Sequence, residues 1–368
     1  RPAMIAHDDL AAWLRLLETP SIGRDTARRL LAAFGSPQAV FDAPPVALRE
    51  LLTAEKAAAL RSPPPSLDAL IEATWQWLDA GEERHVVALG DPAYPRALLE
   101  TADPPLLIHA VGRLALLNAP SVAVVGSRNP TPQGAENARA FATALSHAGL
   151  TVVSGLALGI DGAAHDGALA GQGSTIAVVG TGLDRVYPKR HLKLAHRIAR
   201  DGLMVSEYAL GTPPIAAHFP LRNRLIAGLT RGTLVVEAAL QSGSLITARL
   251  ALEAGREVFA IPGSIHAPQS RGCHALIKQG AKLVDSAVDI LEELRWFDAP
   301  DRPSPATSSP SVEDPVLAAL GHDPVTLDAL SARIGWPPAE LSARLLALEL
   351  SGDVVRLPGQ LFQRLVQA

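Results

Sequence analysis

The stretch VAVVGSRNPTPQGAEN, residues 122–137, decides the fold, because an apolar strand runs into a glycine turn and then into a helix. The turn consists of Gly126, Ser127 and Arg128, and the helix opens near Gly134. Such a turn lets the backbone approach a phosphate, and the helix N-terminus adds unpaired N–H donors at the positive end of its dipole. Arg128 contributes a fork-shaped guanidinium. The stretch therefore predicts an anion-binding site at the end of a strand.

Two common nucleotide motifs are excluded at this turn. A GxGxxG dinucleotide fingerprint needs further glycines at fixed spacing and an acidic residue for the ribose, and the stretch lacks that spacing. No Gly-Lys-Ser or Gly-Lys-Thr follows, so the turn is not a Walker A loop. The turn thus predicts an anion site that matches neither of these nucleotide-binding loops.

The strand–turn–helix pattern returns three times downstream. A strand from Thr151 leads to a Ser-Gly turn, the strand in STIAVVG leads to a Gly-Thr-Gly turn, and a strand that ends near Glu237 leads to a Ser-Gly-Ser turn. These runs predict an α/β fold with a mostly parallel sheet and helices on both faces. Ligands of such sheets lie outside the carboxyl ends of the strands, so the four turns should meet at one edge. The predicted phosphate-binding residues of the turns are Gly126, Ser127, Arg128, Ser154, Gly155, Gly180, Thr181, Gly182, Ser242, Gly243 and Ser244.

A basic segment, DRVYPKRHLKLAHRIAR at residues 184–200, follows the Gly-Thr-Gly turn. Six Lys and Arg residues follow Asp184 in it without a further acid. A run of this kind is often only a solvated helix face. Because it starts at the predicted ligand edge, we expect Lys189 and Arg190 to bind phosphate, whereas the cations further along the helix point elsewhere.

A second cationic element is HFPLRNRLIAGLT, residues 218–230. Arg222 and Arg224 flank Asn223, and Phe219 lies three residues ahead of Arg222. A guanidinium grips a phosphate through two hydrogen bonds, and an aromatic ring offers a stacking face to an unpaired base. Residues two apart on a helix diverge, so we expect one arginine to face the ligand and the other to be structural, paired with Glu237 or Glu207.

No catalytic constellation emerges from the sequence. Asp161 and His165 are four residues apart on one helix face, a spacing that suits a metal or a general base, yet no third ligand motif accompanies them. We expect helix capping for Asp161 and a hydrogen-bonded buried ring for His165. The sequence therefore predicts no catalytic residue, no metal site and no cofactor.

Composition and charge fit a globular protein with a local binding site. The chain has 368 residues, 48% of them hydrophobic, one cysteine and a net charge of -4, which argues against indiscriminate coating of nucleic acid. Residues 121–295 carry 17 Lys and Arg against 13 Asp and Glu, whereas residues 311–368 carry 4 against 7. The single Cys273, the absence of a secretory pattern and the broken apolar runs predict a cytoplasmic protein without a membrane span.

The flanks predict separate modules around the central sheet domain. Residues 1–66 contain short helices around Ser21, Ile22 and Gly23, as in a sterile-alpha-motif-like or helix-hairpin-helix-like bundle. The sheet domain should span residues 67–297, followed by a Pro- and Ser-rich flexible linker at 298–314. Residues 315–368 have the layout of a winged helix. Its second long helix, 338–351, offers Arg344 against two glutamates, which favours protein interaction over duplex readout.

Six motifs between residues 85 and 295 resemble successive signatures of the DNA-processing protein A family (DprA, also called Smf). They are VVGSR, SGLALGIDGAAHDGAL, GTGLDRVYP, HFPLRNRLIAGL, VVEAALQSGSLITARLALEAGREVFAIPG and RGCHALIKQGA. The resemblance implies an extended Rossmann-like core that binds single-stranded DNA and forms a homodimer. It also implies loading of the RecA recombinase on incoming DNA in natural transformation. One departure is His274, where the family commonly has Asn.

An enzyme is the competing hypothesis. Nucleoside-monophosphate phosphoribohydrolases share this kind of core, and their signature resembles PGGxGTxxE, with a glutamate after the glycine turn. Here Glu237 precedes the Ser-Gly-Ser turn, and the helix that follows has no acid until Glu253. The sequence therefore favours a DNA-binding protein over an enzyme.

Overall fold

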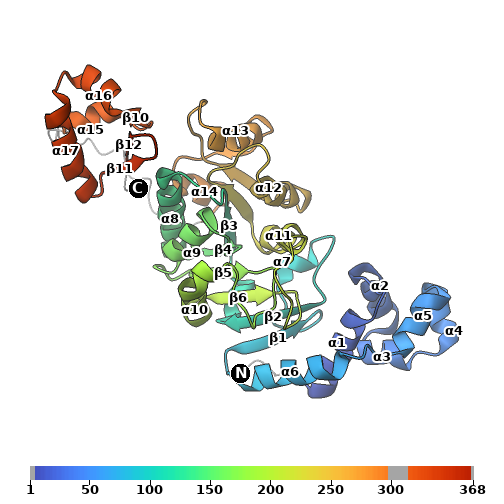
Figure 1. Cartoon of the computed structure of the whole chain (residues 1–368). Coiled ribbons are helices and arrows are strands. Elements are labelled where there is room, and N and C mark those ends of the chain that lie inside the picture. Colours follow the sequence, from blue (N-terminus) through green and yellow to red (C-terminus); the bar gives the residue numbers. More distant parts are fainter. Residues whose placement is uncertain (1–4, 297–313, 366–368) are drawn as a thin grey trace.

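The computed structural model describes residues 5–296 and 314–365 and contains three units: an N-terminal helical domain, a central sheet domain and a small C-terminal domain (Figure 1). Residues 298–313 of the predicted linker lie outside the described residues. The exact domain boundaries at residues 66, 297 and 314 remain predictions.

One nine-stranded sheet forms the core, in the order β1-β2-β6-β5-β4-β3-β7-β8-β9. Strand β2 runs antiparallel to both of its neighbours, and all other neighbouring pairs are parallel. The strands are β1 (Arg84–Ala88), β2 (Leu107–Gly112), β3 (Ser121–Val125), β4 (Thr151–Ser154), β5 (Thr175–Val178), β6 (Leu203–Ser206), β7 (Gly232–Val235), β8 (Glu257–Ala260) and β9 (Lys282–Leu283). The predicted mostly parallel α/β fold is confirmed.

Helices cover both faces of this sheet because the strands are apolar on both sides (Figure 1). Alternate residues of β3 point to opposite faces: Val122 and Val124 pack with α8, α9 and α14, whereas Ala123 and Val125 pack with α11, α12 and α13. The helices of the domain are α7 (Arg96–Leu99), α8 (Pro132–His147), α9 (Ile160–Ala168), α10 (Leu192–Asp201), α11 (His218–Leu229), α12 (Ser244–Glu253), α13 (Arg271–Lys278) and α14 (Ala287–Glu293), with 3-10 turns η1 (Leu114–Asn118), η2 (Lys189–His191) and η3 (Pro268–Ser270).

The strand order reverses direction at β3. From this central strand the chain proceeds to β4, β5 and β6 on one side and later to β7, β8 and β9 on the other. Connections that leave neighbouring strands toward opposite faces open a crevice at the carboxyl ends of those strands. The fold therefore places a crevice between the turns after β3 and β7.

The N-terminal domain packs directly against the sheet domain. Its helices are α1 (His7–Glu18), α2 (Arg24–Phe34), α3 (Pro37–Asp42), α4 (Pro45–Leu51), α5 (Ala54–Arg61) and the connecting helix α6 (Leu67–Asp79). One apolar cluster runs from Leu10 and Leu14 in this domain to Val86 and Leu107 on strands β1 and β2. The predicted helical hairpin around Ser21 lies between α1 and α2.

The C-terminal domain is a winged helix, as predicted. Helices α15 (Pro315–Leu320), α16 (Leu327–Ile334) and α17 (Pro338–Leu350) pack on a small sheet of β10 (Val325–Thr326), β11 (Val354–Leu357) and β12 (Leu361–Arg364). Among the described residues, no helix combines the length and the apolar character that a membrane crossing requires.

A buried histidine next to the connecting helix predicts a pH-dependent stability. His109 on β2 is 1% exposed and packs edge-on against Trp77, and burial lowers the pKa of His109 to about 4. The unfolded chain, with a histidine pKa of about 6.5, then binds more protons than the folded chain between these two values. His109 therefore does not lower the free energy of unfolding above about pH 6.5, and it lowers this free energy progressively as the pH drops toward 4.

We expect His109→Leu to remove about 2 kcal/mol of the stability difference between about pH 7.5 and about pH 5. Urea unfolding of the wild type and the variant at both pH values measures this difference. His165, which is also buried, is present in both proteins and cancels in the comparison. Equal pH dependence of the two proteins would contradict the assignment.

Candidate nucleic-acid interface

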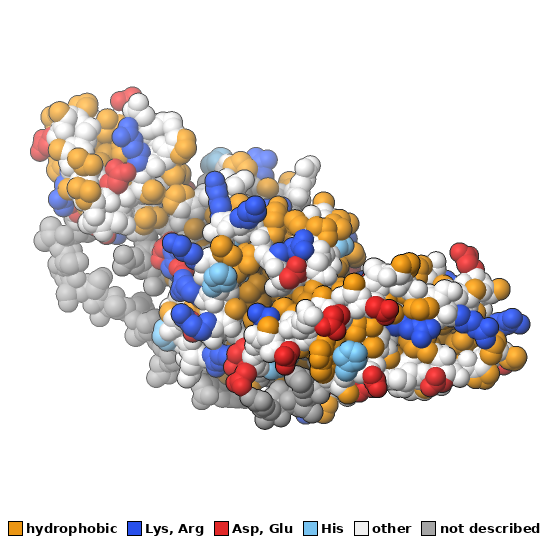
Figure 2. All heavy atoms as spheres, turned by 60° about the horizontal axis from the view of Figure 1, so that its bottom comes forward, with side chains coloured by type: hydrophobic (Ala, Val, Ile, Leu, Met, Phe, Trp, Pro, Cys, Tyr) orange, Lys and Arg blue, Asp and Glu red, His pale blue; other side chains and the backbone are white. Residues whose placement is uncertain are grey.

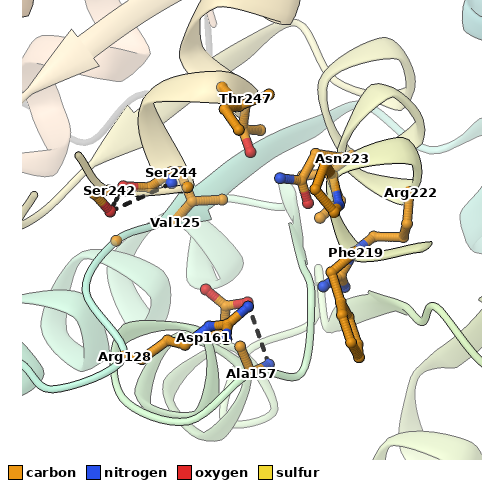
Figure 3. Close-up of a pocket in the computed structure, with 15 residues that line it drawn as sticks. Val125, Arg128, Ala157, Asp161, Phe219, Arg222, Asn223, Ser242, Ser244 and Thr247 are labelled. Carbon is orange, nitrogen blue, oxygen red and sulfur yellow. Dashed lines mark hydrogen bonds between the residues drawn. The ribbon is translucent and has the colours of Figure 1, made fainter. Parts of the chain in front are cut away.

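A pocket of about 400 Å³ lies in the crevice at the strand reversal. Figure 3 shows Phe219 and Asn223 of α11 on one side of the pocket, the Ser-Gly-Ser turn on the other, and Arg128 and Asp161 beneath. The pocket is lined by Val125, Gly126, Arg128, Ala157, Asp161, Phe219, Pro220, Arg222, Asn223, Ile226, Ser242, Gly243, Ser244, Ile246 and Thr247. The turns after β3, β4 and β7 meet there, whereas the fourth predicted turn, after β5, contributes no lining residue.

The turn after β3 is held tightly against the neighbouring strands. The Ser127 amide donates to the Glu237 carbonyl over 2.8 Å. A Cβ atom on Gly126 would lie 2.7 Å from an Ile160 side-chain carbon and 2.9 Å from the Glu237 carbonyl, so only glycine fits. This close approach fixes the backbone from which Arg128 extends.

Arg128 provides a free cation next to an aromatic ring. Its guanidinium carbon lies 5.9 Å from the centre of the Phe219 ring, within the range of a cation–π contact. Arg128 makes no ion pair within the described parts of the chain. The Tyr187 ring lies 5.5 Å from the Phe219 ring and is 48% exposed. Arg128 and Phe219 therefore line the pocket, and together with Tyr187 they also line a smaller neighbouring cavity; the sequence analysis missed Tyr187.

Asp161 and His165 have structural partners. The Asp161 carboxylate accepts hydrogen bonds from the amides of Gly155 (3.1 Å) and Ala157 (3.3 Å), and burial raises the pKa of Asp161. His165 contacts the Thr175 hydroxyl and accepts from the Leu156 amide, while burial lowers its pKa to about 3. No group of three metal-ligating side chains occurs in the part of the chain that the structure describes. The predicted buried, hydrogen-bonded role of His165 is confirmed. The predicted helix capping by Asp161 is wrong, because Gly159 stands at the N-cap of α9 and the Asp161 carboxylate instead binds the turn that precedes this helix.

The two arginines of α11 differ in surroundings. Arg222 is 4% exposed at the pocket wall, donates to the carbonyls of Gly155 (2.6 Å) and Val178, and has its pKa lowered by burial to about 10. Arg224 lies outside the pocket lining and pairs with Asp103 (2.7 Å) and Glu207 (2.5 Å). The predicted pairing of one arginine with Glu207 is confirmed. Because the Arg224 guanidinium already pairs with two carboxylates, we assign it no phosphate contact.

The basic segment after β5 is only partly free. Arg185, Arg197 and Arg200 pair with Asp184, Asp166 and Asp201. Lys189, Arg190 and Lys193 have no acidic partner among the residues described. On the face shown in Figure 2, Lys and Arg side chains stand among acidic ones instead of forming one continuous basic surface. The cations without an acidic partner are therefore confined to a few positions of this segment. Lys189 and Arg190 are among them.

Some predicted turn residues support the pocket from behind. The Ser154 hydroxyl is buried and donates to the Val124 carbonyl, and the buried Thr181 accepts from Ser206 through its carbonyl. A Cβ atom on Gly180 would lie 3.3 Å from the Phe219 ring. The structure thus places Ser154, Thr181 and Gly180 in backbone packing, and Gly182 and Ser127 also lie outside the lining of this pocket.

Other predicted residues do line the pocket with polar groups. The Asn223 amide makes no hydrogen bond to any described residue and faces the cavity (Figure 3). The hydroxyls of Ser242 and Ser244 lie 2.7 Å apart at the opposite wall, beside Gly243. Amide and hydroxyl groups of this kind hydrogen-bond phosphates and base edges alike.

Glu237, the residue nearest to the competing enzyme signature, holds the start of α8. Its carboxylate accepts from the Thr131 amide (2.9 Å) and the Thr131 hydroxyl (2.5 Å), and burial raises its pKa. A Cβ atom on Gly134 would clash with this carboxyl group. Glu237 lies outside the lining of the pocket, which leaves the phosphoribohydrolase hypothesis without its glutamate.

His274 and Cys273 on α13 lie outside the pocket. The His274 ring nitrogen Nε2 lies 3.0 Å from the Gly263 carbonyl and so ties α13 to the loop after β8. Cys273 is fully buried, and burial raises the pKa of its thiol to about 12. His274, noted in the sequence as a departure, thus makes a loop contact and does not line the pocket.

The family model for DNA recombination-mediator protein A matches residues 85–295, which include the whole pocket. The chain belongs to this family. The models for a DprA-like N-terminal HHH domain and a DprA winged helix domain match residues 7–63 and 300–360. Both flanking modules therefore agree with the family as well.

Individual relatives of the family match over most of the chain. Protein Smf of Escherichia coli is 42% identical over 363 residues, covering 95% of each chain. The X-ray structure of DNA processing protein A from Streptococcus pneumoniae aligns with a TM-score of 0.64 and 39% identity over 79% of this chain and 99% of that one. A structure of the Helicobacter pylori protein, described for its single-stranded DNA binding mode, aligns with a TM-score of 0.52 and 33% identity over 57% and 95%.

Proposed function

We propose that this member of the DprA family binds single-stranded DNA in the pocket at the strand reversal. The observation that carries the proposal is the free Arg128 guanidinium over the Phe219 ring at the pocket mouth. The guanidinium suits a phosphate, and the ring suits an unpaired base, a combination that duplex DNA does not require. The Helicobacter pylori relative, described as binding single-stranded DNA, supports this reading.

The salt dependence of binding tests the electrostatic part of the proposal. Arg128, Lys189 and Arg190 supply about three phosphate contacts, and each neutralised phosphate contributes about 0.7 to the slope on single strands. We expect log K to fall with log salt by about 2 per protomer. Fluorescence anisotropy of a labelled oligothymidylate measures the slope, with duplex DNA as the comparison. A slope near zero would contradict the account.

We further propose that bound DNA is protected and handed to the RecA recombinase in natural transformation, a cytoplasmic role. The family membership supports this step, because the family is that of a recombination mediator. The test is RecA assembly on oligothymidylate covered by single-stranded DNA-binding protein, with and without this protein. Unchanged assembly would contradict mediation. The absence of base release from nucleoside monophosphates is the result expected of a protein that is not an enzyme.

We also propose a homodimer formed through the sheet domain. A groove of about 430 Å³ between α12 and α13 is lined by several leucines, of which Leu240 and Leu252 are 59% and 54% exposed. Exposed apolar side chains that gather on one face often mark a protein interaction site. A dimer would place two pockets on one assembly and so strengthen binding of a strand that reaches both.

The combined substitution Leu240→Glu and Leu252→Glu is expected to give a monomer, because each change places a charge on the apolar groove. Analytical ultracentrifugation of the full chain at micromolar concentration measures the state. Leu346→Glu on the winged helix, where the leucine is 57% exposed, is the matched control and should leave the dimer intact. The reverse result would assign the interface to the winged helix.

A further inference from the structure

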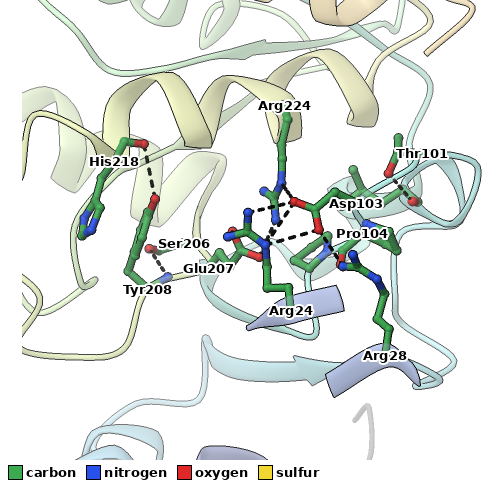
Figure 4. Close-up of polar contacts among 12 residues, drawn as sticks. Arg24, Arg28, Thr101, Asp103, Pro104, Ser206, Glu207, Tyr208, His218 and Arg224 are labelled. Atoms are coloured by element: carbon green, nitrogen blue, oxygen red, sulfur yellow. Dashed lines mark hydrogen bonds and ion pairs between the residues drawn. The ribbon is translucent and has the colours of Figure 1, made fainter. Parts of the chain in front are cut away.

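Five charged side chains form a cluster at the junction of the helical domain and the sheet domain (Figure 4). Asp103, in the loop between α7 and β2, accepts from Arg28 over 2.6 Å and from Arg224 over 2.7 Å, and pairs with Arg24 over 2.8 Å. Glu207, after β6, pairs with Arg224 over 2.5 Å and with Arg24 over 3.6 Å. We name these five residues the interdomain clamp.

The clamp is sheltered from solvent. The side chains of Glu207 and Arg224 are 10% and 13% exposed, and that of Asp103 is 31% exposed. Burial alone would raise the pKa of Asp103, but hydrogen bonds from Arg224, Arg24 and Arg28 outweigh burial and hold the pKa below its usual value. Asp103 is therefore ionised in the neutral range and presents a negative charge to the three guanidinium groups.

Helix α11 connects the clamp to the DNA pocket. Phe219, Arg222, Asn223 and Ile226 have the spacing of one helix face and line the pocket. Arg224 lies on the other side of the same helix. One helix of 12 residues therefore both lines the pocket and contributes Arg224 to the interdomain clamp.

Three contacts tie α11 to the clamp. Besides the Arg224 ion pairs, the Tyr208 ring stacks on the His218 ring with centres 4.0 Å apart, and its hydroxyl donates to the His218 carbonyl over 3.3 Å. Tyr208 directly follows Glu207, and His218 is the first residue of α11. At the other end, a Cβ atom on Gly228 would lie 2.9 Å from Thr101, so α11 packs closely on the loop that carries Asp103.

We propose that the helical domain, through Arg24 and Arg28, sets the position of α11 and thereby the affinity of a DNA pocket that it does not line. This inference rests on the proposed function of the pocket. Arg24 and Arg28 act as positioning residues, because both lie in α2 and neither lines the pocket. Arg24 and Arg28, which follow the hairpin between α1 and α2, thus pair with carboxylates of the sheet domain and do not contact DNA.

The full-length variant Arg24→Ala with Arg28→Ala tests the proposal. We expect its affinity for a labelled oligothymidylate to fall about tenfold, because α11 loses part of its support. The salt slope should stay that of the wild type, since no phosphate contact is removed. Hydrogen exchange at the α11 amides should become faster. Replacing both residues with Lys retains the charges and should restore most of the affinity.

Two further variants keep the test decisive. Asp103→Asn removes the shared carboxylate from the core side and should reproduce the loss if the double variant does not fold. Asp314→Asn breaks a comparable Asp–Arg pair in the winged helix and should leave DNA affinity unchanged.

Other results would contradict the inference or the proposed function. Unchanged affinity in both clamp variants would overturn the inference, and a shallower salt slope would overturn it by assigning Arg24 and Arg28 a direct phosphate contact. Absence of binding by the wild type would overturn the proposed function instead. Hydrogen exchange would then still report whether the clamp holds α11.

Discussion

Arg128→Ala is expected to weaken binding of single-stranded DNA by about 10- to 100-fold without changing the melting temperature. Hydrogen bonds to charged groups contribute about 1.5–3 kcal/mol, and the substitution also removes the cation over Phe219. Stability should not change, because Arg128 makes no ion pair with any described residue. Anisotropy titration and thermal melting of the same preparations measure both quantities.

The matched control for this variant is Arg344→Ala. Arg344 lies on α17 of the winged helix and pairs with Asp314, so a neighbouring carboxylate already neutralises it. We expect its loss to leave binding of single strands nearly unchanged. The opposite ranking, in two proteins that both remain folded, would make the winged helix the DNA-binding element.

Arg222→Met should show the reverse behaviour, a large loss of stability. The guanidinium donates to the carbonyls of Gly155 and Val178 and lies near the buried carboxylate of Asp161. Removing one partner from such a buried arrangement costs about 3–5 kcal/mol, because the remaining groups stay buried without compensation. Urea unfolding monitored by circular dichroism measures the difference in the free energy of unfolding.

Arg190→Met controls for the loss of a cation in general. Arg190 belongs to η2 and has no acidic partner among the described residues, so its substitution should leave the free energy of unfolding within about 0.5 kcal/mol of the wild type. A stable Arg222→Met protein with reduced DNA affinity would instead assign Arg222 to the DNA.

The core architecture could be predicted because its signals are local. Apolar runs that end in Gly or Ser turns recur along the chain, and the parallel sheet brings their ends together regardless of side-chain detail. The order of residues 122–137 therefore already implied both β3 and the start of α8. Arg128 and Ser242 could be placed at one edge on this basis alone, whereas Phe219 was predicted only from the composition of its own segment, residues 218–230.

The fate of the arginines could not be predicted in the same way. Arg222 and Arg224 are only two residues apart, yet their partners differ. Arg222 donates to the carbonyl of Gly155, directly after β4, and to that of Val178 at the end of β5. Arg224 donates to Asp103, 121 positions earlier in the chain. The burial and the ion pairs of an arginine side chain depend on residues far away in the chain. The pattern of a single sequence does not indicate which distant residues these are. Asp103 itself lies in a loop without a motif and so remained unnoticed.

The burial of Cys273 has a practical consequence for spectroscopy. Burial shields this thiol from solvent and raises its pKa to about 12, so it forms almost no thiolate at neutral pH and we expect no reaction with maleimides. The natural chain can then serve as its own unlabelled blank, and cysteines introduced at exposed positions become selective attachment sites without removal of a native residue. A dye pair at Glu55 on the helical domain and Lys193 on α10, both exposed, would report by energy transfer whether the two domains separate when DNA leaves.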